Sequence, residues 1–500
     1  MHMPDKIHLN VVPPDELRLP TEILAIIINE LALDSTGDND GTLAALTSCR
    51  LASHVLYSLT TPLLFSSIEL TDDVRLFTSR KDRLVASNLL WTRATKLSQI
   101  LTTDDVAASV QNFTLRCHPE NLTSQTNGTL ISTILHRLPH IQRFSLEALE
   151  TNSERGFLLF SLMTDGFSSA IQVMCRSPSL TTLYLDNIKG FPATAIAACP
   201  NLQCLHLWCV EPSVNFKFFV FFFFFATTNS IFQFANVDSI DETSSRQLLY
   251  LEVDEYSIYF LGPGTSGSFA NFFISRIKKI QIRNLFCDAT TLNCGWDIML
   301  LASRNLTTLD LLNSGRGGFI ALTLHLFPRR AHDDKFGLGF SRNLEYVLGG
   351  VPFDLGRFPA LRHFKFQQQN WRERNVAPLY CLNRFLSIST SISGIETLEI
   401  DITWDEVIVG SGKNLFSSVN EWSILDRVLA SEKFVFLKKV VLNLNLRMEV
   451  DLERVGLDNH RYILEFERNL TLPYVNALLP MFGALTSSER TLEIHFKVSF

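Results

Sequence analysis

One spacing of apolar residues recurs through most of the chain. An apolar residue is followed by two more, three and five positions later, as in Leu180, Leu183 and Leu185. The last residues of each segment alternate between apolar and polar, which is typical of a strand that buries one face. Eight segments fit the spacing: Ile141/Phe144/Leu146, Leu180/Leu183/Leu185, Leu202/Leu205/Leu207, Leu248/Leu251/Val253, Leu306/Leu309/Leu311, Leu361/Phe364/Phe366, Ile395/Leu398/Ile400 and Leu437/Val440/Leu442.

The recurrence predicts a chain of stacked units. A single unit cannot cover its own apolar face, so neighbouring units must place their strands side by side and parallel. The spacing between units is uneven, from 22 residues between Leu180 and Leu202 to 58 between Leu248 and Leu306. We therefore expect residues 72–500 to form an α/β fold, an irregular leucine-rich-repeat solenoid of parallel strands with covering helices and loops.

The amino-terminal part of the chain has a different, helical pattern. After a polar lead-in over residues 1–16, apolar residues fall at helical spacing over residues 17–33, with Pro20 in the first turn, where proline is tolerated. Helical patterning resumes over residues 42–59. Pro62 then predicts the end of the helix and the start of an apolar strand that reaches Leu70.

This helical segment resembles the F-box-like domain of fungal proteins. The resemblance rests on the opening motif Leu19-Pro20-x-Glu22-Ile23-Leu24 and the closing motif Thr61-Pro62-Leu63-Leu64-Phe65, and it covers residues 17–71. It implies docking to the Skp-type adaptor of a cullin-RING ubiquitin ligase. The docking surface that it implies comprises Leu19, Pro20, Ile23, Leu24, Ile27, Leu31, Leu46 and Leu56, part of which also holds the module together.

Polar side chains that alternate with the strand leucines are the candidates for binding a protein substrate, because repeat proteins usually bind on that face. Trp208 is the foremost of them, since tryptophan is enriched at binding hot spots. The alternative is that Trp208 tucks beneath the edge of its unit. The candidates are Tyr184, Asp186, His206, Trp208, Asp310, His363, Lys365 and Glu399.

A phenylalanine-rich stretch interrupts the repeats. Nine phenylalanines lie between Phe216 and Phe232, in an apolar run shorter than the roughly 20 residues of a membrane span. Deleting residues 214–233 leaves 26 of the 46 residues between Leu202 and Leu248, within the usual repeat length of about 20 to 29. We interpret residues 214–233 as a translated intron or a disordered insertion.

Motifs for catalysis or cofactor binding are weak. Residues 262–267 match GxGxxG but contain Pro263, and residues 409–413 lack the first glycine of a phosphate-binding loop. Cys199, Cys204, His206 and Cys209 do not have zinc-site spacing, and the acidic group Asp401, Asp405 and Glu406 reads as charged strand ends. We expect no enzyme activity, no cofactor and no metal.

Composition limits the kinds of partner and the cellular compartment that we expect for this protein. The net charge is -7 with no long basic run, which argues against nucleic acid as a ligand. Nine cysteines without a CxxC pair, and a start without an apolar secretory segment, favour the cytoplasm or nucleus. The expected function is substrate recognition for a cullin-RING (SCF-type) ligase. The alternative is a leucine-rich-repeat scaffold that binds a protein without any ligase.

Overall fold

The computed structural model describes most of the 500-residue chain, in several stretches. These are residues 21–33, 39–72, 80–149, 158–210, 248–261, 274–285, 289–313, 354–371, 377–407, 419–449, 476, 478–487 and 490–499. The chain divides into two compact units, one formed by residues 1–145 and 164–179, the other by residues 146–163 and 180–500.

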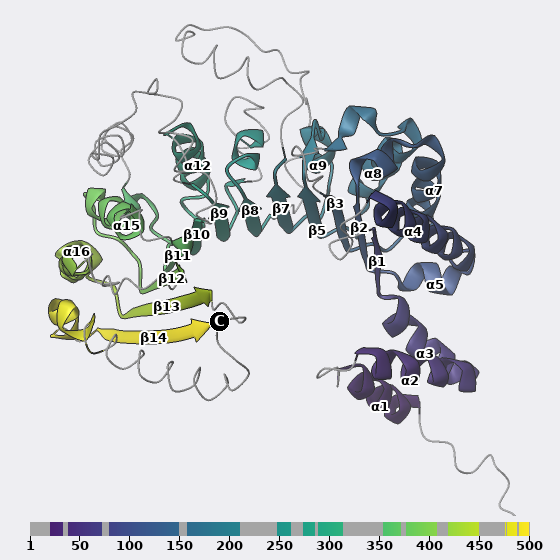
Figure 1. The fold of residues 1–500 in the computed structure, drawn as a ribbon, viewed down its shortest axis with the longest axis horizontal. Coiled ribbons are helices and arrows are strands. Elements are labelled where there is room, and N and C mark those ends of the chain that lie inside the picture. The colour runs from purple at the N-terminus through teal and green to yellow at the C-terminus, as the bar shows by residue number, and fades with distance from the viewer. Residues whose placement is uncertain are drawn as a thin grey trace, which may run out of the picture. The chain divides into compact units, whose positions relative to one another are not determined.

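Three helices open the first unit: α1 (Thr21–Leu33), α2 (Asn39–Ala52) and α3 (His54–Phe65) (Figure 1). The helical pattern breaks at Ser53, whose hydroxyl accepts a hydrogen bond from Leu56 N–H at 3.1 Å and so caps α3. The prediction that Pro62 ends the helix is wrong, because α3 contains Pro62 and continues to Phe65. Its neighbours Thr60 and Thr61 are buried, and this packing keeps the last turn helical despite the missing N–H.

The rest of the first unit alternates strands with helices. Its remaining elements are β1 (Ser67–Thr71), α4 (Arg80–Ile100), α5 (Asp104–Ser109), β2 (Asn112–Cys117), α6 (Pro119–Thr123), α7 (Gln125–His136), α8 (Asp165–Cys175) and the beginning of β3 (Arg143–Ala148). The buried Asp72 joins β1 to the turn after β2, where it accepts hydrogen bonds from the His118 N–H and, at 2.6 Å, from the Asn121 side chain.

The second unit consists of short strands separated by helices. Its strands are β4 (Leu158–Leu159), β5 (Thr182–Asp186), β6 (Ile188–Lys189), β7 (Cys204–Trp208), β8 (Tyr250–Val253), β9 (Lys279–Arg283), β10 (Thr308–Asn313), β11 (His363–Trp371), β12 (Thr397–Val407), β13 (Lys439–Glu449) and β14 (Thr491–Ser499). Its α-helices are α9 (Ala193–Ala197), α12 (Ala289–Leu301), α15 (Ala377–Ile388), α16 (Val419–Ala430) and α18 (Gly483–Thr486). Short 3-10 helices lie at Phe160–Leu162, Ser257–Phe260, Leu355–Arg357, Glu432–Phe434 and Leu479–Phe482.

The strands follow one another in space as they do along the chain. Twelve of them form one sheet in the order β1-β2-β3-β5-β7-β8-β9-β10-β11-β12-β13-β14, and β4 pairs with β6 separately. The β1–β2 pair and every neighbouring pair from β5 to β14 run parallel. The predicted α/β class with parallel strands is thus confirmed.

The recurring apolar residues form the core, as their spacing predicts. All three apolar positions of all eight segments are buried, with at most 3% of any side chain exposed. In the second unit, helices α9, α12, α15 and α16 lie on one side of the strands (Figure 1). Phe364 of β11 packs against Phe385 of α15 with ring centroids 5.8 Å apart, so the apolar side of the sheet faces these helices. We call the other side, which carries the alternating polar residues, the polar face.

Strands β1, β2, β9 and β14 lie outside the eight predicted segments. Three of them carry the same spacing, in Phe65/Ile68/Leu70, Val110/Phe113/Leu115 and Ile277/Ile280/Ile282. The β9 segment divides the 58 residues between Leu248 and Leu306 into two equal steps of 29 residues. The longest gap between the predicted segments is therefore explained by a strand, β9, that the sequence analysis overlooked.

Three strands of the second unit end in the same kind of turn. Asn187 after β5, Cys209 after β7 and Asn284 after β9 have φ angles of 57°, 50° and 54°, the left-handed region that asparagine tolerates better than most residues. Two of these turns donate a backbone hydrogen bond to the end of the next strand, from Asn187 to the Trp208 carbonyl and from Asn284 to the Leu312 carbonyl. The turn is thus a repeated feature that joins one strand to the next strand of the sheet.

Several segments discussed from the sequence lie outside the described residues. They are the phenylalanine-rich residues 214–233, the glycine-rich residues 262–267 and residues 409–413. Among the helices that are described, none combines the length and the apolar character required to cross a bilayer.

Candidate protein-binding surfaces

Strand register gathers five of the predicted substrate-binding residues into one row across the polar face. The row runs Tyr184, His206, Glu252, Gln281, Asp310, Lys365, Glu399. Asp186 and Trp208 are paired with each other two residues further along their strands, and His363 lies two residues before Lys365. All eight predicted residues therefore belong to three adjacent rows of one face.

Aromatic rings cluster at the β5–β8 end of this row. The Tyr184 ring lies 5.7 Å from His206 and 5.4 Å from Trp208, and the His206 ring lies 5.1 Å from Tyr250. These four residues, which we call the aromatic cluster, are all half-buried. A group of large rings that is partly accessible is typical of protein-binding hot spots.

Glu252 of β8 connects this cluster by hydrogen bonds. Its carboxylate accepts bonds from His206 at 2.8 Å, from the Tyr250 hydroxyl at 3.1 Å and from the Gln281 amide at 3.1 Å. Arg283 of β9 donates two more, from Nε at 3.0 Å and from a terminal nitrogen at 2.9 Å. Burial by itself would raise the pKa of Glu252, but the bonds from His206 and Arg283 outweigh it and lower the pKa to about 2. Glu252 is therefore a fixed negative charge that holds three neighbouring strands in place.

Arg283 also contacts Trp208 directly. The guanidinium carbon lies 3.7 Å from the centre of the tryptophan ring, within cation–π distance. Trp208 also makes an edge contact with the Tyr184 ring. Its indole Nε1 is buried without a hydrogen-bond partner among the described residues. Trp208 is thus held by its neighbours on the polar face. It is half-buried, which is intermediate between the fully exposed position and the position beneath the strand edge that the sequence allowed.

A second polar group lies further along the row, on β11 to β13. Lys365 Nζ lies 2.7 Å from Glu399 and 2.8 Å from Asp401, and the Asn443 amide donates to both carboxylates. Burial lowers the pKa of Lys365, yet the two hydrogen-bonded carboxylates outweigh it and the pKa is raised. The ammonium group is consequently a stable cation at the centre of this group.

Asp310 is the least satisfied member of the row. It is 7% exposed, and its Oδ1 is buried without a hydrogen-bond partner among the described residues. Burial raises the pKa of Asp310 to about 6, against the attraction of Lys365 and Lys279. The sequence predicted Asp310 as a substrate-binding residue. Asp310 does belong to the polar face, but its side chain is buried there and not openly accessible.

Nothing in the described residues forms a metal-binding group of three or more His, Cys, Asp or Glu side chains. Burial, with Asp254 nearby, raises the pKa of the Cys209 thiol far above its usual range, so this cysteine is a poor nucleophile and metal ligand. Asp401, one of the acidic residues considered for acid–base chemistry, is held by Lys365 and Asn443. The side chains of Asp405 and Glu406 lie outside the described residues.

Sequence reasoning missed several residues of this face. Glu252 holds the same position in its segment, between Leu251 and Val253, as Asp310, Lys365 and Glu399 hold in theirs, so the spacing alone could have found it. Gln281 and Arg283 were missed because their strand was overlooked. Asn443 lies beyond the repeated segment, where β13 extends further than the spacing indicates. Asp401, also beyond its segment, was named from the sequence but interpreted as a charged strand end.

A second surface lies on the amino-terminal helices. Ile23, Ile26 and Ile27 of α1 are 43%, 57% and 50% exposed, and their spacing places them on one side of the helix. We call these three residues the α1 face. Ile28 of α1 and Leu46 of α2 are buried, so Leu46 belongs to the core of the module and is not available to a partner. Leu24 and Leu56 are half-buried, whereas Leu19, Pro20 and the Leu31 side chain lie outside the described residues.

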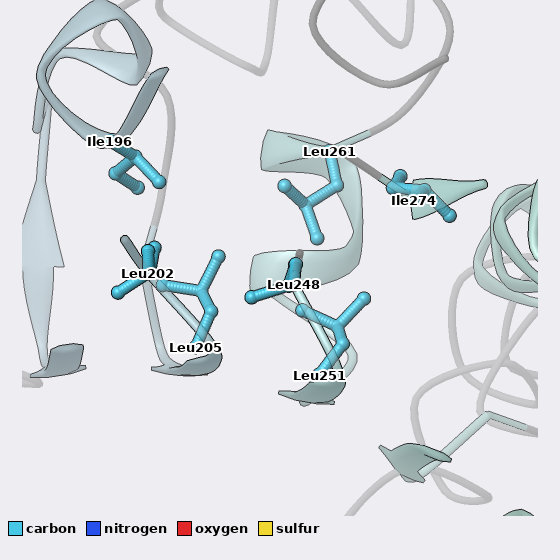
Figure 2. Close-up of a pocket in the computed structure, with 7 residues that line it drawn as sticks. All are labelled: Ile196, Leu202, Leu205, Leu248, Leu251, Leu261 and Ile274. Carbon is cyan, nitrogen blue, oxygen red and sulfur yellow. The ribbon is translucent and has the colours of Figure 1, made fainter. Parts of the chain in front are cut away.

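The sheet also contains a small cavity between β7 and β8. Seven aliphatic side chains line it: Ile196, Leu202, Leu205, Leu248, Leu251, Leu261 and Ile274 (Figure 2). Its volume is about 10 Å³, barely the size of one water molecule, and its lining offers no polar partner. It is a packing void of the core and not a ligand site.

No protein-family model matches the sequence, and no curated protein matches it. Function is therefore inferred from the contacts and exposed surfaces described above.

Proposed function

We propose that this protein is the substrate-recognition subunit of a cullin-RING (SCF-type) ubiquitin ligase. In this proposal α1, α2 and α3 form an F-box-like module that docks the Skp-type adaptor. The strand–helix units form an irregular leucine-rich-repeat solenoid whose polar face binds a target protein. The protein itself contributes binding, and catalysis belongs to its ligase partners.

The α1 face is the observation that carries the docking half of the proposal. Three isoleucines project from one helix, while Ile28 and Leu46 hold that helix in its module. Large apolar residues clustered at a surface mark interaction sites, whereas single exposed ones are ordinary. About half of each isoleucine is already covered. Burying the rest would contribute roughly 0.7 to 1.5 kcal/mol each before the cost of ordering the interface, so the three together can support a specific contact.

The polar face supports the target-binding half. The aromatic cluster and Arg283 supply the residue types that dominate binding energy at protein interfaces. The two polar groups beside it hold fixed charges of both signs, at Glu252 and Lys365. Charges held in fixed positions favour selection among partners, because a partner must complement the charge pattern of the face. The buried leucine positions and the repeated left-handed turns support the solenoid assignment.

A pull-down with purified Skp-type adaptor tests the docking half. The Ile27→Asp variant should reduce adaptor binding by tenfold or more, because it places a charge in an apolar interface. Ile392→Asp is the matched control, since Ile392 is 59% exposed but lies in the second unit, and it should bind the adaptor normally.

Two results would count against ligase association: a wild-type protein that fails to bind the adaptor, or equal binding by wild type and Ile27→Asp. A protein that still captured a partner through the polar face would then be a leucine-rich-repeat scaffold without a ligase. That second function rests on the aromatic cluster alone.

A further inference from the structure

Asp310 is a buried carboxylate whose neighbours in the row direct their hydrogen-bond donors elsewhere. It is 7% exposed, and its Oδ1 has no hydrogen-bond partner among the described residues. Its neighbours in the row are Gln281 of β9 and Lys365 of β11. The Gln281 amide donates to Glu252, and the Lys365 ammonium is held by two carboxylates of β12. Neither neighbour therefore satisfies Asp310.

Lys279 of β9 is the other cation whose charge acts on Asp310, and it too is directed elsewhere. Its Nζ lies 5.3 Å from the centre of the Tyr250 ring, within cation–π distance. A buried acceptor without a donor is costly, and most buried polar groups in proteins have a partner. Local features that cost stability are expected mainly at functional sites. The unsatisfied carboxylate thus indicates a group that is kept for a ligand.

Negative charge exceeds positive charge around this residue. Asp310, Glu399 and Asp401, which we call the β10–β12 acidic group, share the single ammonium of Lys365. Even when Lys279 is included, three carboxylates face two cations. The side chains of Glu399 and Asp401 are 35% and 21% exposed, so the group reaches the surface of the polar face. A further positive charge would therefore be attracted to it.

We propose that the β10–β12 acidic group binds a cationic side chain, lysine or arginine, of the target protein. This inference rests on the proposed target-binding role of the polar face and names the chemistry that this part of the face recognises. The cationic N–H groups would donate to Asp310 and supply the positive charge that Lys365 alone does not. The terminal torsion of a carboxylate is broad, so the partly accessible Asp310 can turn toward such a donor.

Fluorescence anisotropy of a labelled peptide of alternating arginine and serine, titrated with the full chain near neutral pH, tests this proposal. Matched peptides carry lysine, or the uncharged citrulline, in place of each arginine. The wild type should bind the arginine peptide, the lysine peptide or both more tightly than the citrulline peptide. Asp310→Asn should raise the dissociation constant of the cationic peptide about fivefold or more, because a charge-assisted hydrogen bond is lost.

Asp105→Asn is the matched control, since it removes the same charge from an exposed residue of the first unit. It should bind the cationic peptide as the wild type does, which excludes a general attraction to a chain of net charge -7. Circular dichroism establishes that each variant is folded. Equal affinity of wild type and Asp310→Asn for the cationic peptide would overturn the proposal, and so would equal affinity of the wild type for the cationic and citrulline peptides.

The adaptor pull-down separates this proposal from ligase association. A wild type that binds the cationic peptide selectively but fails to bind the adaptor would keep the cation site and lose the ligase role. A wild type that binds the adaptor but shows no preference for the cationic peptides would overturn the cation site alone.

Discussion

Two buried carboxylates in one row of the polar face, Glu252 and Asp310, have opposite pKa shifts. Glu252 is surrounded by donors from His206, Gln281 and Arg283, and its pKa is lowered to about 2. Asp310 has an unsatisfied oxygen, and its pKa is raised to about 6. Burial acts on both residues in the same direction, so the number of hydrogen-bond donors decides the difference.

Asp310→Asn should stabilise the protein at neutral pH. Above pH 6 the carboxylate is ionised in the folded chain at a cost, because its folded pKa of about 6 exceeds the value near 3.9 expected when unfolded. The stability lost as pH rises from about 4 to 6 is at most about 3 kcal/mol, and the asparagine variant avoids that loss. Urea unfolding at neutral pH and near pH 4 measures it.

The gain should vanish near pH 4, where Asp310 is protonated in the folded state and no longer carries the cost. The exposed Asp105→Asn variant serves as the control and should change little at either pH. An equal effect of Asp310→Asn at both pH values would mean that its origin is not ionisation.

At the scale of single elements, the strands were more predictable than the contacts between them. Spacing found eight strands and would have found three more, because each strand repeats the same buried positions. It fails at β14, where Glu489 stands at the first apolar position. The end of α3 was misjudged because buried threonines beside Pro62 stabilise a turn that proline alone disfavours.

The candidate site was only partly predictable for a physical reason. Which polar residues point to the polar face follows from alternation along each strand, so Tyr184, His206 and Lys365 were found. Which of them meet depends on pairing between segments far apart in the chain, as for Glu252 with Arg283. No local pattern encodes that pairing.

Strand β9 offers a test at this scale. Ile280→Ala should destabilise the protein by about 2 to 5 kcal/mol, because it removes a fully buried side chain from between two neighbouring strands. Lys279→Ala, on the preceding and exposed residue, should cost less than about 1 kcal/mol. Chemical denaturation compares them, and similar losses for both variants would contradict the assignment of Ile280 to the core.

At the scale of the whole molecule, the two proposed surfaces belong to different compact units. The α1 face lies in the first unit, and the aromatic cluster lies in the second. Residues that share no contacts and no partners usually act independently. Adaptor docking and target capture should therefore be separable by mutation.

Trp208→Ala should abolish target capture while adaptor binding is kept, and Ile27→Asp should do the reverse. Loss of a hot-spot tryptophan costs about 2 kcal/mol or more, which is at least about thirtyfold in affinity. Pull-down followed by mass spectrometry of the bound proteins measures both activities. Trp208→Phe, which keeps a ring beneath Arg283, should retain part of target binding. Loss of both partners from a folded Trp208→Ala protein would argue against separate surfaces.

The order of strands in the sheet has a consequence for how the chain is made. Within the twelve-stranded sheet of the described residues, neighbouring strands are also consecutive sheet strands along the chain, so each new strand pairs with the sheet strand made just before it. As the polypeptide leaves the ribosome, a newly completed strand finds the edge on which it belongs already assembled. Synthesis and assembly can therefore proceed in the same direction, and at each stage only the most recently added strand has an edge that awaits a partner.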